Sequence, residues 1–451
     1  MMTSTQMRRH GLFDARVPRY TSYPTANHFT ADVGPEEMAE FLGAVPASER
    51  ISLYLHIPFC RRLCWFCACR TQGTSTASPV RAYVETLKRE IEMMRARLPE
   101  GVALSRLHWG GGTPTLLEAE TIRDLARAIE TSFPLADGAE FSVEIDPNEI
   151  DEARLDALAE VGLTRASIGV QDFDPDIQKI IGRDQSFDTT KQAVDGLRAR
   201  GIDSLNVDIL YGLPNQSDAR ISDSVQRVLS LNPDRIALYG YAHVPWMARR
   251  QALIPTDLLP RPEERLALFE TAARLFRWDG YMDIGIDHFA RPEDGLAVAL
   301  KEGRLRRNFQ GYTDDQAEVL LGLGASSISR FPGGFAQNAP ATSKWVGAVE
   351  AGMVATARGV VLSRDDALRG VLIEMLMCEF GIDTARAADR AGADPAAVEA
   401  CLTPLLKSYP DALRKTARGI EVQPEARPLT RILARALDAW DVKSDGHSLA
   451  I

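Results

Sequence analysis

The sequence has few cysteines and no excess of positive charge, and both absences narrow the possible functions. Six cysteines among 451 residues are too few for a secreted protein built on disulfides. The formal net charge of −10 argues against nucleic acid as a partner, since nucleic-acid binding usually needs a basic surface. An anionic ligand would therefore have to be met by a local basic pocket.

Long apolar runs are also missing. No stretch reaches the roughly eighteen consecutive apolar residues of a membrane span, and the N-terminus has no apolar run of signal-peptide length. We therefore expect a cytoplasmic protein without a membrane span. Its 45% hydrophobic and 25% charged residues are ordinary for a globular enzyme with a sizeable core.

From about residue 51 to 240, short β-rich runs alternate with longer amphipathic stretches. Strands that alternate with helices predict right-handed βαβ units and a parallel sheet, here a partial (βα)6 parallel barrel in the α/β class. The strand candidates are residues 51–57, 105–109, 139–145, 164–170, 204–210 and 234–240.

The composition along the chain predicts four regions. They are an irregular N-terminal arm (1–50), the barrel (51–290), a barrel extension and linker (291–362) and a small, mostly helical C-terminal domain (363–451). A long helix is expected at 262–278, and residues 288–345 look Gly-rich and loop-like.

Four of the six cysteines lie within ten consecutive positions, in CRRLCWFCAC, directly after the first predicted strand: Cys60, Cys64, Cys67 and Cys69. A parallel sheet places chemistry at the carboxyl ends of its strands, so this is a site-like position. A structural zinc site is one interpretation, because zinc takes four thiolates. Zinc sites generally use two separated pairs, however, whereas Cys378 and Cys401 are isolated within helical patterns. Thiolates in one short loop favour an iron–sulfur cluster.

The C-x3-C-x2-C spacing after the first strand, followed by GGGTPT after the second, resembles the radical S-adenosylmethionine superfamily. The resemblance narrows to the oxygen-independent coproporphyrinogen III oxidase (dehydrogenase) family. It rests on RYTSYPT, LYLHIPFCRRLCWFCAC, LHWGGGTPT, SVEIDP, GVQDF, DILYGLP, YAHVP, DHFARPED and RNFQGYT. Cys69, two residues after the third cysteine of the motif, separates this family from the heme-chaperone-like relatives, which generally lack it.

This resemblance implies an oxidoreductase of heme biosynthesis that converts two propionates of coproporphyrinogen III into vinyl groups, giving protoporphyrinogen IX. A deoxyadenosyl radical generated at a [4Fe–4S] cluster would start the reaction, with two molecules of S-adenosylmethionine (SAM) bound and an unidentified reductant supplying electrons. The protein is expected to be a monomer. The alternative is another tetrapyrrole-acting radical enzyme or a heme-chaperone-like relative.

The resemblance also implies residue roles. Cys60, Cys64 and Cys67 would hold the cluster, and Cys69 and Gln310 would act in catalysis. The first SAM would contact Tyr54, Gly111, Glu144 and Ile328, and the second Phe66, Gly112, Thr113, Gln171, Arg183, Asp208 and Ala242. The residues alone also allow structural roles: Glu144 as a strand-end surface charge, Arg183 as a solvated helix-end arginine, and Asp208 as a paired buried carboxylate.

An acidic protein with a substrate that bears four propionates needs basic residues near its site. The candidates are Arg19 and Arg291 first, together with Arg61, Arg62, Arg306 and Arg307. Each arginine alone is more often a surface residue than a ligand. Four histidines within the motif segments are interpreted as orienting or packing groups, not iron ligands: His56, His108, His243 and His288.

Overall fold

The protein is built around one curved sheet, seen in a computed structural model that describes residues 2–440 and 447–451. Twelve strands form this sheet in the order β16-β15-β14-β13-β1-β4-β5-β6-β7-β8-β10-β9. The six predicted strands are all present, pair in parallel in chain order and confirm the partial barrel. Their bounds are β1 Arg50–Ile57, β4 Ala103–Gly111, β5 Leu135–Ile145, β6 Arg165–Gln171, β7 Ser204–Tyr211 and β8 Arg235–Gly240.

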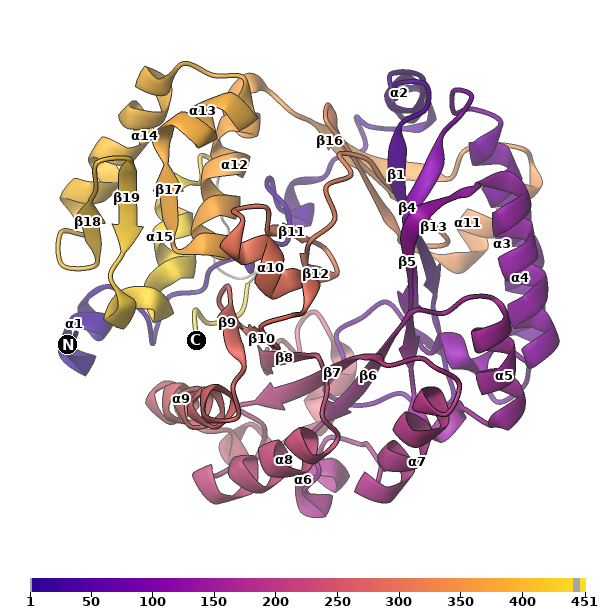
Figure 1. The fold of residues 1–451 in the computed structure, drawn as a ribbon, viewed down its shortest axis with the longest axis horizontal. Coiled ribbons are helices and arrows are strands. Elements are labelled where there is room, and N and C mark those ends of the chain that lie inside the picture. The colour runs from indigo at the N-terminus through magenta and orange to yellow at the C-terminus, as the bar shows by residue number, and fades with distance from the viewer. Residues whose placement is uncertain (1, 441–446) are drawn as a thin grey trace.

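Amphipathic helices connect these strands and cover the outer face of the curved sheet (Figure 1). Side-chain caps fix where several of them begin: Asp151, Ser186 and Ser217 each accept a hydrogen bond from a backbone N–H of the first turn. The helix expected at residues 262–278 is α9, and it begins and ends at those two residues. The bounds are α3 Ser78–Arg95, α4 Ala119–Ser132, α5 Glu152–Glu160, α6 Pro175–Ile180, α7 Phe187–Arg198, α8 Asp218–Ser230 and α9 Pro262–Trp278.

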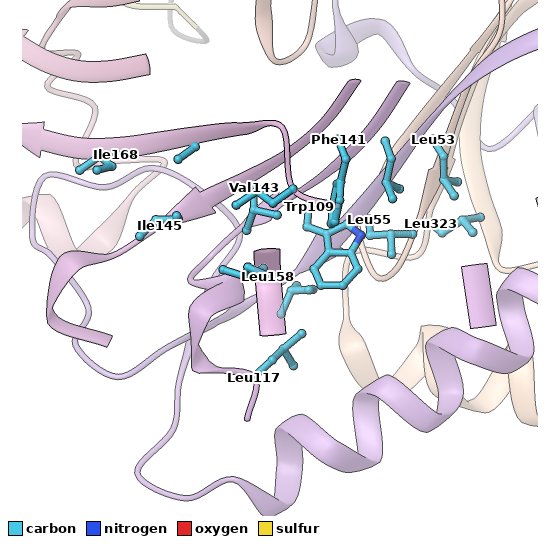
Figure 2. Packing of buried hydrophobic residues seen from close by; sticks show 14 of the residues in the cluster. Leu53, Leu55, Trp109, Leu117, Phe141, Val143, Ile145, Leu158, Ile168 and Leu323 are labelled. Carbon is cyan, nitrogen blue, oxygen red and sulfur yellow. The ribbon is translucent and has the colours of Figure 1, made fainter. Parts of the chain in front are cut away.

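The main core lies between the sheet and these helices. Trp109 is fully buried and packs edge to face on Phe141 of the neighbouring strand, with ring centroids 5.0 Å apart. Figure 2 shows these rings among Leu55, Val143 and Leu158. Because alternate strand residues point outward into this core, the intervening ones face the barrel interior.

The expectation that residues 288–345 form loops is wrong for much of the segment. β13 pairs in parallel with β1, and β14, β15 and β16 extend the sheet by antiparallel pairing. The glycines that suggested a loop permit close strand contact: a Cβ on Gly322 would lie 2.5 Å from the Ile328 carbonyl oxygen. The bounds of this segment are β9 Met282–Ile284, β10 His288–Ala290, α10 Gly295–Lys301, β11 Arg306–Asn308, β12 Gly311–Thr313, β13 Leu320–Leu323, β14 Ile328–Phe331, β15 Gly334–Asn338, α11 Thr342–Glu350 and β16 Thr356–Val361.

The N-terminal arm is only partly irregular, which corrects the sequence prediction. α1 (Ser4–Arg9) and α2 (Pro35–Gly43) flank the irregular proline-containing stretch, and Pro35 itself begins α2. Leu12, Phe13 and other residues of the arm are buried in the same cluster as the C-terminal helices. Figure 1 accordingly shows both chain ends beside the C-terminal elements.

The C-terminal part is mostly helical, as predicted, and also contains a three-stranded sheet of order β17-β19-β18. Cys378 is fully buried and Cys401 packs against the C-terminal core. The bounds are α12 Arg364–Glu379, β17 Gly381–Asp383, α13 Thr384–Ala391, α14 Pro395–Ser408, β18 Leu413–Lys415, β19 Gly419–Val422 and α15 Thr430–Leu437. Over the described residues, no helix combines the length and apolarity that a bilayer crossing requires.

Candidate active site

The cysteine loop leaves the carboxyl end of β1 and is tied back to the barrel on both sides. Two short parallel strands, β2 (Phe59–Cys60) and β3 (Gln72–Gly73), close its base. The Trp65 amide donates to the Ile181 carbonyl at 2.9 Å, and the buried Gln251 amide donates to the carbonyls of Phe66 (2.7 Å) and Ala242 (3.0 Å). These contacts fix the loop although the residues between its cysteines are not in regular structure.

The four thiols of the loop differ in their electrostatic environment. Burial raises the pKa of Cys60 to about 11 and also raises that of Cys64, whereas a hydrogen bond from the Cys69 thiol lowers the pKa of Cys67 to about 6. Cys69 is exposed as a residue, but its thiol points toward Cys67, and its pKa is raised well above the usual value by that hydrogen bond. Cys67 thus differs from the other three thiols, since it alone has a lowered pKa.

A cluster with several irons suits this loop better than a single metal ion. Among the described residues, no three His, Cys, Asp or Glu side chains converge closely enough to hold one ion. Cys60, Cys64 and Cys67 nevertheless lie within one short loop after β1. Thiolates supplied by one short loop fit a cubane, in which each iron takes its own thiolate.

A glycine turn at the end of β4 brings the backbone close to the cysteine loop. Gly111 has φ +107°, and a Cβ there would lie 2.4 Å from His56 Nδ1, while a Cβ on Gly112 would lie 2.5 Å from the Phe59 carbonyl oxygen. The Thr113 amide donates to that same carbonyl at 2.7 Å, and the Thr113 hydroxyl hydrogen-bonds to the Cys60 thiol. Only glycine permits this approach of strand end and loop.

Glu144 at the end of β5 faces the same turn. Its Oε2 accepts a hydrogen bond from the Gly111 amide at 3.0 Å, and its Oε1 lies 3.6 Å from His108 Nε2. Glu144 thus makes two specific polar contacts at the strand end, while its side chain stays 42% exposed. A carboxylate beside free backbone groups is suited to an ammonium or a ribose hydroxyl.

Three aromatic residues line the wall between β1 and β4. The Tyr54 ring stacks on His108 with centroids 5.6 Å apart, and the Tyr54 hydroxyl lies 3.0 Å from His56 Nδ1. His108 Nδ1 lies 2.5 Å from the Ser142 hydroxyl oxygen. His56 and His108 are held as orienting groups, as the sequence predicts. Ile328 begins β14, and its carbonyl abuts Gly322, the register partner of Tyr54.

Arg183 points at the cysteine loop and is not a solvated helix-end residue. Its Nη1 donates to Cys64 Sγ at 3.5 Å, and its Nη2 donates to Gln185 Oε1 at 2.5 Å, while its Nε is buried without a hydrogen-bond partner in the described part of the chain. Gln171, in the left-handed conformation at φ +70°, ends β6 next to this group. A buried donor without a partner needs an explanation, and a ligand oxygen would supply one here.

Asp208 and Gln310 border the same cavity at the barrel. Both line an interior cavity of about 130 Å³, together with Glu144 and His288. Burial raises the pKa of Asp208 to about 6, and Asn206 Nδ2 donates to its carboxylate at 2.9 Å. Asp208 thus has no arginine or lysine partner among the described residues, which favours a ligand role over a structural ion pair.

Of the two leading substrate candidates, Arg19 lies at the carboxyl edge and Arg291 does not. The Arg19 guanidinium donates to the carbonyl of Gly240, the last residue of β8. Arg291 lies at the opposite edge, 3.0 Å from an Asp279 carboxylate oxygen and stacked over Tyr281. Four further candidates are engaged with carboxylates: Arg61 with Glu149, Arg62 with Asp184, Arg306 with Glu318, and Arg307 with Asp287.

Two buried residues of α3 that hold the β13–β14 loop against the site carry no sequence signal. The Tyr83 hydroxyl donates to the His56 carbonyl at 2.7 Å and accepts from the Ala325 amide at 2.8 Å. Glu90 accepts from the Gly324 amide at 2.7 Å, and burial raises its pKa to about 7. Both lie within an ordinary amphipathic helix pattern, so only their tertiary contacts reveal them.

Known proteins resemble the chain over its whole length. A family model described as the Radical SAM superfamily matches residues 54–228. The oxygen-independent coproporphyrinogen III oxidase of Paracoccus denitrificans is 61% identical across all of both chains, and that of Cereibacter sphaeroides is 56% identical over 98% of each.

A solved structure agrees with this match. Coproporphyrinogen III oxidase from Escherichia coli, described as a radical SAM enzyme, superposes with a TM-score of 0.89 at 36% identity, covering 93% of this chain and 97% of that one. Identity and fold therefore agree from end to end, and the chain belongs to the oxygen-independent coproporphyrinogen III oxidase family of the radical SAM superfamily.

Proposed function

We propose that the protein is an oxidoreductase that converts two propionates of coproporphyrinogen III into vinyl groups without oxygen, giving protoporphyrinogen IX for heme biosynthesis. The single observation that carries this function is the cysteine loop: three neighbouring thiols at the carboxyl edge, with the thiol of Cys69 hydrogen-bonded to Cys67 beside them. The extra thiol distinguishes this activity from that of heme-chaperone-like relatives.

The residues present fit the implied cofactors. When bound, a [4Fe–4S] cluster and SAM supply one-electron reduction and hydrogen-atom abstraction, chemistry that no protein side chain provides. Cys60, Cys64 and Cys67 would hold the cluster. Trp65 and Phe66, packed against a buried apolar group that includes Ile181 and Leu213, exclude water from that side of the loop.

The glycine turn and the strand-end polar groups would hold two SAM molecules. Tyr54, Gly111, Glu144 and Ile328 form the wall for the first, where Glu144 can accept from an ammonium. For the second, Arg183 offers its unsatisfied Nε to a carboxylate and Asp208 accepts from hydroxyls. The remaining residues of this second set are Phe66, Gly112, Thr113, Gln171 and Ala242.

Cys69 and Gln310 are proposed to act next to the reacting atoms. The Cys69 amide donates to Cys67 Sγ at 3.4 Å, which holds Cys69 directly beside the third thiol of the motif, where its own thiol could hold or deliver a proton. Gln310 reaches the interior cavity from the segment before β12 and can orient a propionate by its amide. We further infer that the protein acts as a cytoplasmic monomer that takes electrons from a separate reductant.

The test is anaerobic turnover of the reconstituted protein with coproporphyrinogen III, SAM and dithionite. The expected product has lost the mass of two CO2 molecules, and deoxyadenosine accumulates with it. The Cys401→Ser variant, altered at a cysteine of α14, is the matched control and should behave as the unmodified protein. Deoxyadenosine without any decarboxylated tetrapyrrole would overturn this function and favour another tetrapyrrole-acting relative.

A further inference from the structure

A groove of about 440 Å³ runs between the cysteine loop and the segment that follows β8. We propose that this groove binds propionate carboxylates of the tetrapyrrole that are not reacting, through Arg70, Arg249 and Arg250. The inference rests on the proposed function and deepens it by naming the residues that select a carboxylate-bearing ring. Cys67 and Cys69 line the same groove, so a ring edge held there lies beside the reaction site.

The two walls of the groove are joined to each other. Arg250 Nη2 donates to the Thr71 hydroxyl at 2.9 Å and to the Cys69 carbonyl at 3.4 Å. The next residue, Gln251, ties the same segment to Phe66. The two segments that carry the arginines are therefore joined to each other, which lowers the entropy lost on binding.

The charge of the groove is unbalanced. Its lining holds three arginines and, within the described residues, no aspartate or glutamate, in a protein whose net charge is −10. Arg62, Arg291 and Arg306, by contrast, each have a carboxylate within about 3 Å. Neither Arg70 nor Arg249 forms an ion pair over the part of the chain that is described. Guanidinium groups left without a carboxylate are suited to bind one from a ligand, often with two parallel hydrogen bonds.

The rest of the lining fits the apolar part of a porphyrinogen. Met247 shares the lining with the arginines and is 57% exposed, whereas Val244 and Ala325 of the same lining are buried. A macrocycle with an apolar face and carboxylates on its rim matches an exposed apolar side chain that lies among cations. SAM carries a single carboxylate and its predicted contacts lie at other residues, so the tetrapyrrole is the ligand we assign to this groove.

The test measures binding of coproporphyrin III, the fluorescent oxidised form that bears the same four carboxylates, to the reconstituted holoprotein. Arg249→Gln should weaken binding about tenfold and Arg70→Gln with Arg249→Gln about a hundredfold, since a hydrogen bond to a charged group contributes about one tenfold step. Arg89→Gln, an exposed position on α3, is the matched control and should leave binding unchanged. Arg250 is not substituted because it also fixes the loop.

Two further measurements distinguish recognition of the carboxylates from a general loss of tetrapyrrole binding. The tetramethyl ester of coproporphyrin III, which lacks the carboxylates, should bind equally to the variants and to the unmodified protein. In turnover driven by dithionite, KM for coproporphyrinogen III should rise while kcat and the iron–sulfur absorption stay unchanged. Equal coproporphyrin affinity in all proteins, or an equal loss of ester binding, would overturn the inference. Because binding is measured without turnover, a protein that binds but yields no product would contradict only the proposed function.

Discussion

Two glutamates four residues apart on β5 face the same barrel interior but have opposite environments. Glu140, toward the amino end, lies 2.5 Å from Arg106 and 3.1 Å from Arg165, and these guanidiniums lower its pKa to about 2. Glu144, at the carboxyl end, accepts from the Gly111 amide and lies 3.6 Å from His108.

The same contrast extends to the neighbouring strands. At the amino end, Arg235 is paired with Asp294 at 2.7 Å and Arg106 with Asp314 at 2.6 Å. At the carboxyl end, Asp208 has no arginine or lysine partner and Arg183 has no carboxylate partner within the described residues. Charges that satisfy each other stabilise a barrel, whereas charges that lack a partner mark where a ligand is expected.

The largest effect should come from the cysteine loop. Cys60→Ser, Cys64→Ser or Cys67→Ser should each abolish cluster assembly, because each removes one iron ligand. Cys69→Ser should retain the cluster but form no product. Iron content and visible absorption after anaerobic reconstitution measure cluster assembly in all four variants, and turnover with coproporphyrinogen III measures product formation by Cys69→Ser. If Cys69→Ser also lost iron, Cys69 would be a ligand and the division of roles among the four thiols would be wrong.

At the amino end, Glu140→Gln should lower the free energy of unfolding by about 1–3 kcal/mol, since Arg106 and Arg165 each lose one carboxylate but keep Asp314 and Asp294. Urea denaturation measures this loss. Glu92→Gln, an exposed glutamate of α3, is the matched control and should change stability little. A loss of less than about 1 kcal/mol in Glu140→Gln would contradict a structural role for the paired end.

At the carboxyl end, Asp208→Asn should weaken ligand binding without loss of stability, the reverse of the effect expected for Glu140→Gln. The variant should be at least as stable as the unmodified protein near neutral pH, because an amide avoids the cost of a buried unpaired charge. Its affinity for SAM should fall about tenfold to a hundredfold, as expected when a hydrogen bond to a charged acceptor is weakened. Calorimetry measures the affinity of the variant for SAM. An unchanged affinity would show that Asp208 does not contact the cofactor.

The two carboxylates should also give opposite pH dependences of stability. The pKa of Asp208 is raised from 3.8 to about 6, so the folded state binds more protons and the free energy of unfolding should fall as pH rises between these values. The pKa of Glu140 is lowered from 4.5 to about 2, so its stabilisation should be lost as pH falls through that range. Urea denaturation at several pH values measures the free energy of unfolding against pH. The fall assigned to Asp208 should be absent in Asp208→Asn, and the loss assigned to Glu140 should be absent in Glu140→Gln.

The smallest effect is expected at the rim of the cysteine loop. Arg62 and Asp184 lie 3.0 Å apart, with side chains 65% and 85% exposed. Arg62→Ala should therefore cost at most about 1 kcal/mol of stability, as solvent-exposed pairs do, and should leave the cluster absorption intact. A larger loss in urea denaturation would show that this pair fixes the loop, as the buried pairs fix the other end.

The sequence predicted the parallel strands because alternation of apolar runs with helical patterns is a local signal. It failed for residues 320–338, where β13, β14 and β15 are short and glycine-rich. Their glycines are required by close packing of strand on strand, as at Gly322, and that packing involves partners that are distant in the chain. Local composition could not distinguish this from a loop.

The sequence alone also determined the chemistry of the site, since the spacing of Cys60, Cys64, Cys67 and Cys69 is a covalent property of one short loop. Only the tertiary structure decided which charges are free to act. Arg291 and Arg249 look alike as isolated arginines, yet one is paired with Asp279 and the other borders the groove beside the cysteines. The physical reason is that the pairing of a charge depends on neighbours brought together by folding, which the chain order does not reveal.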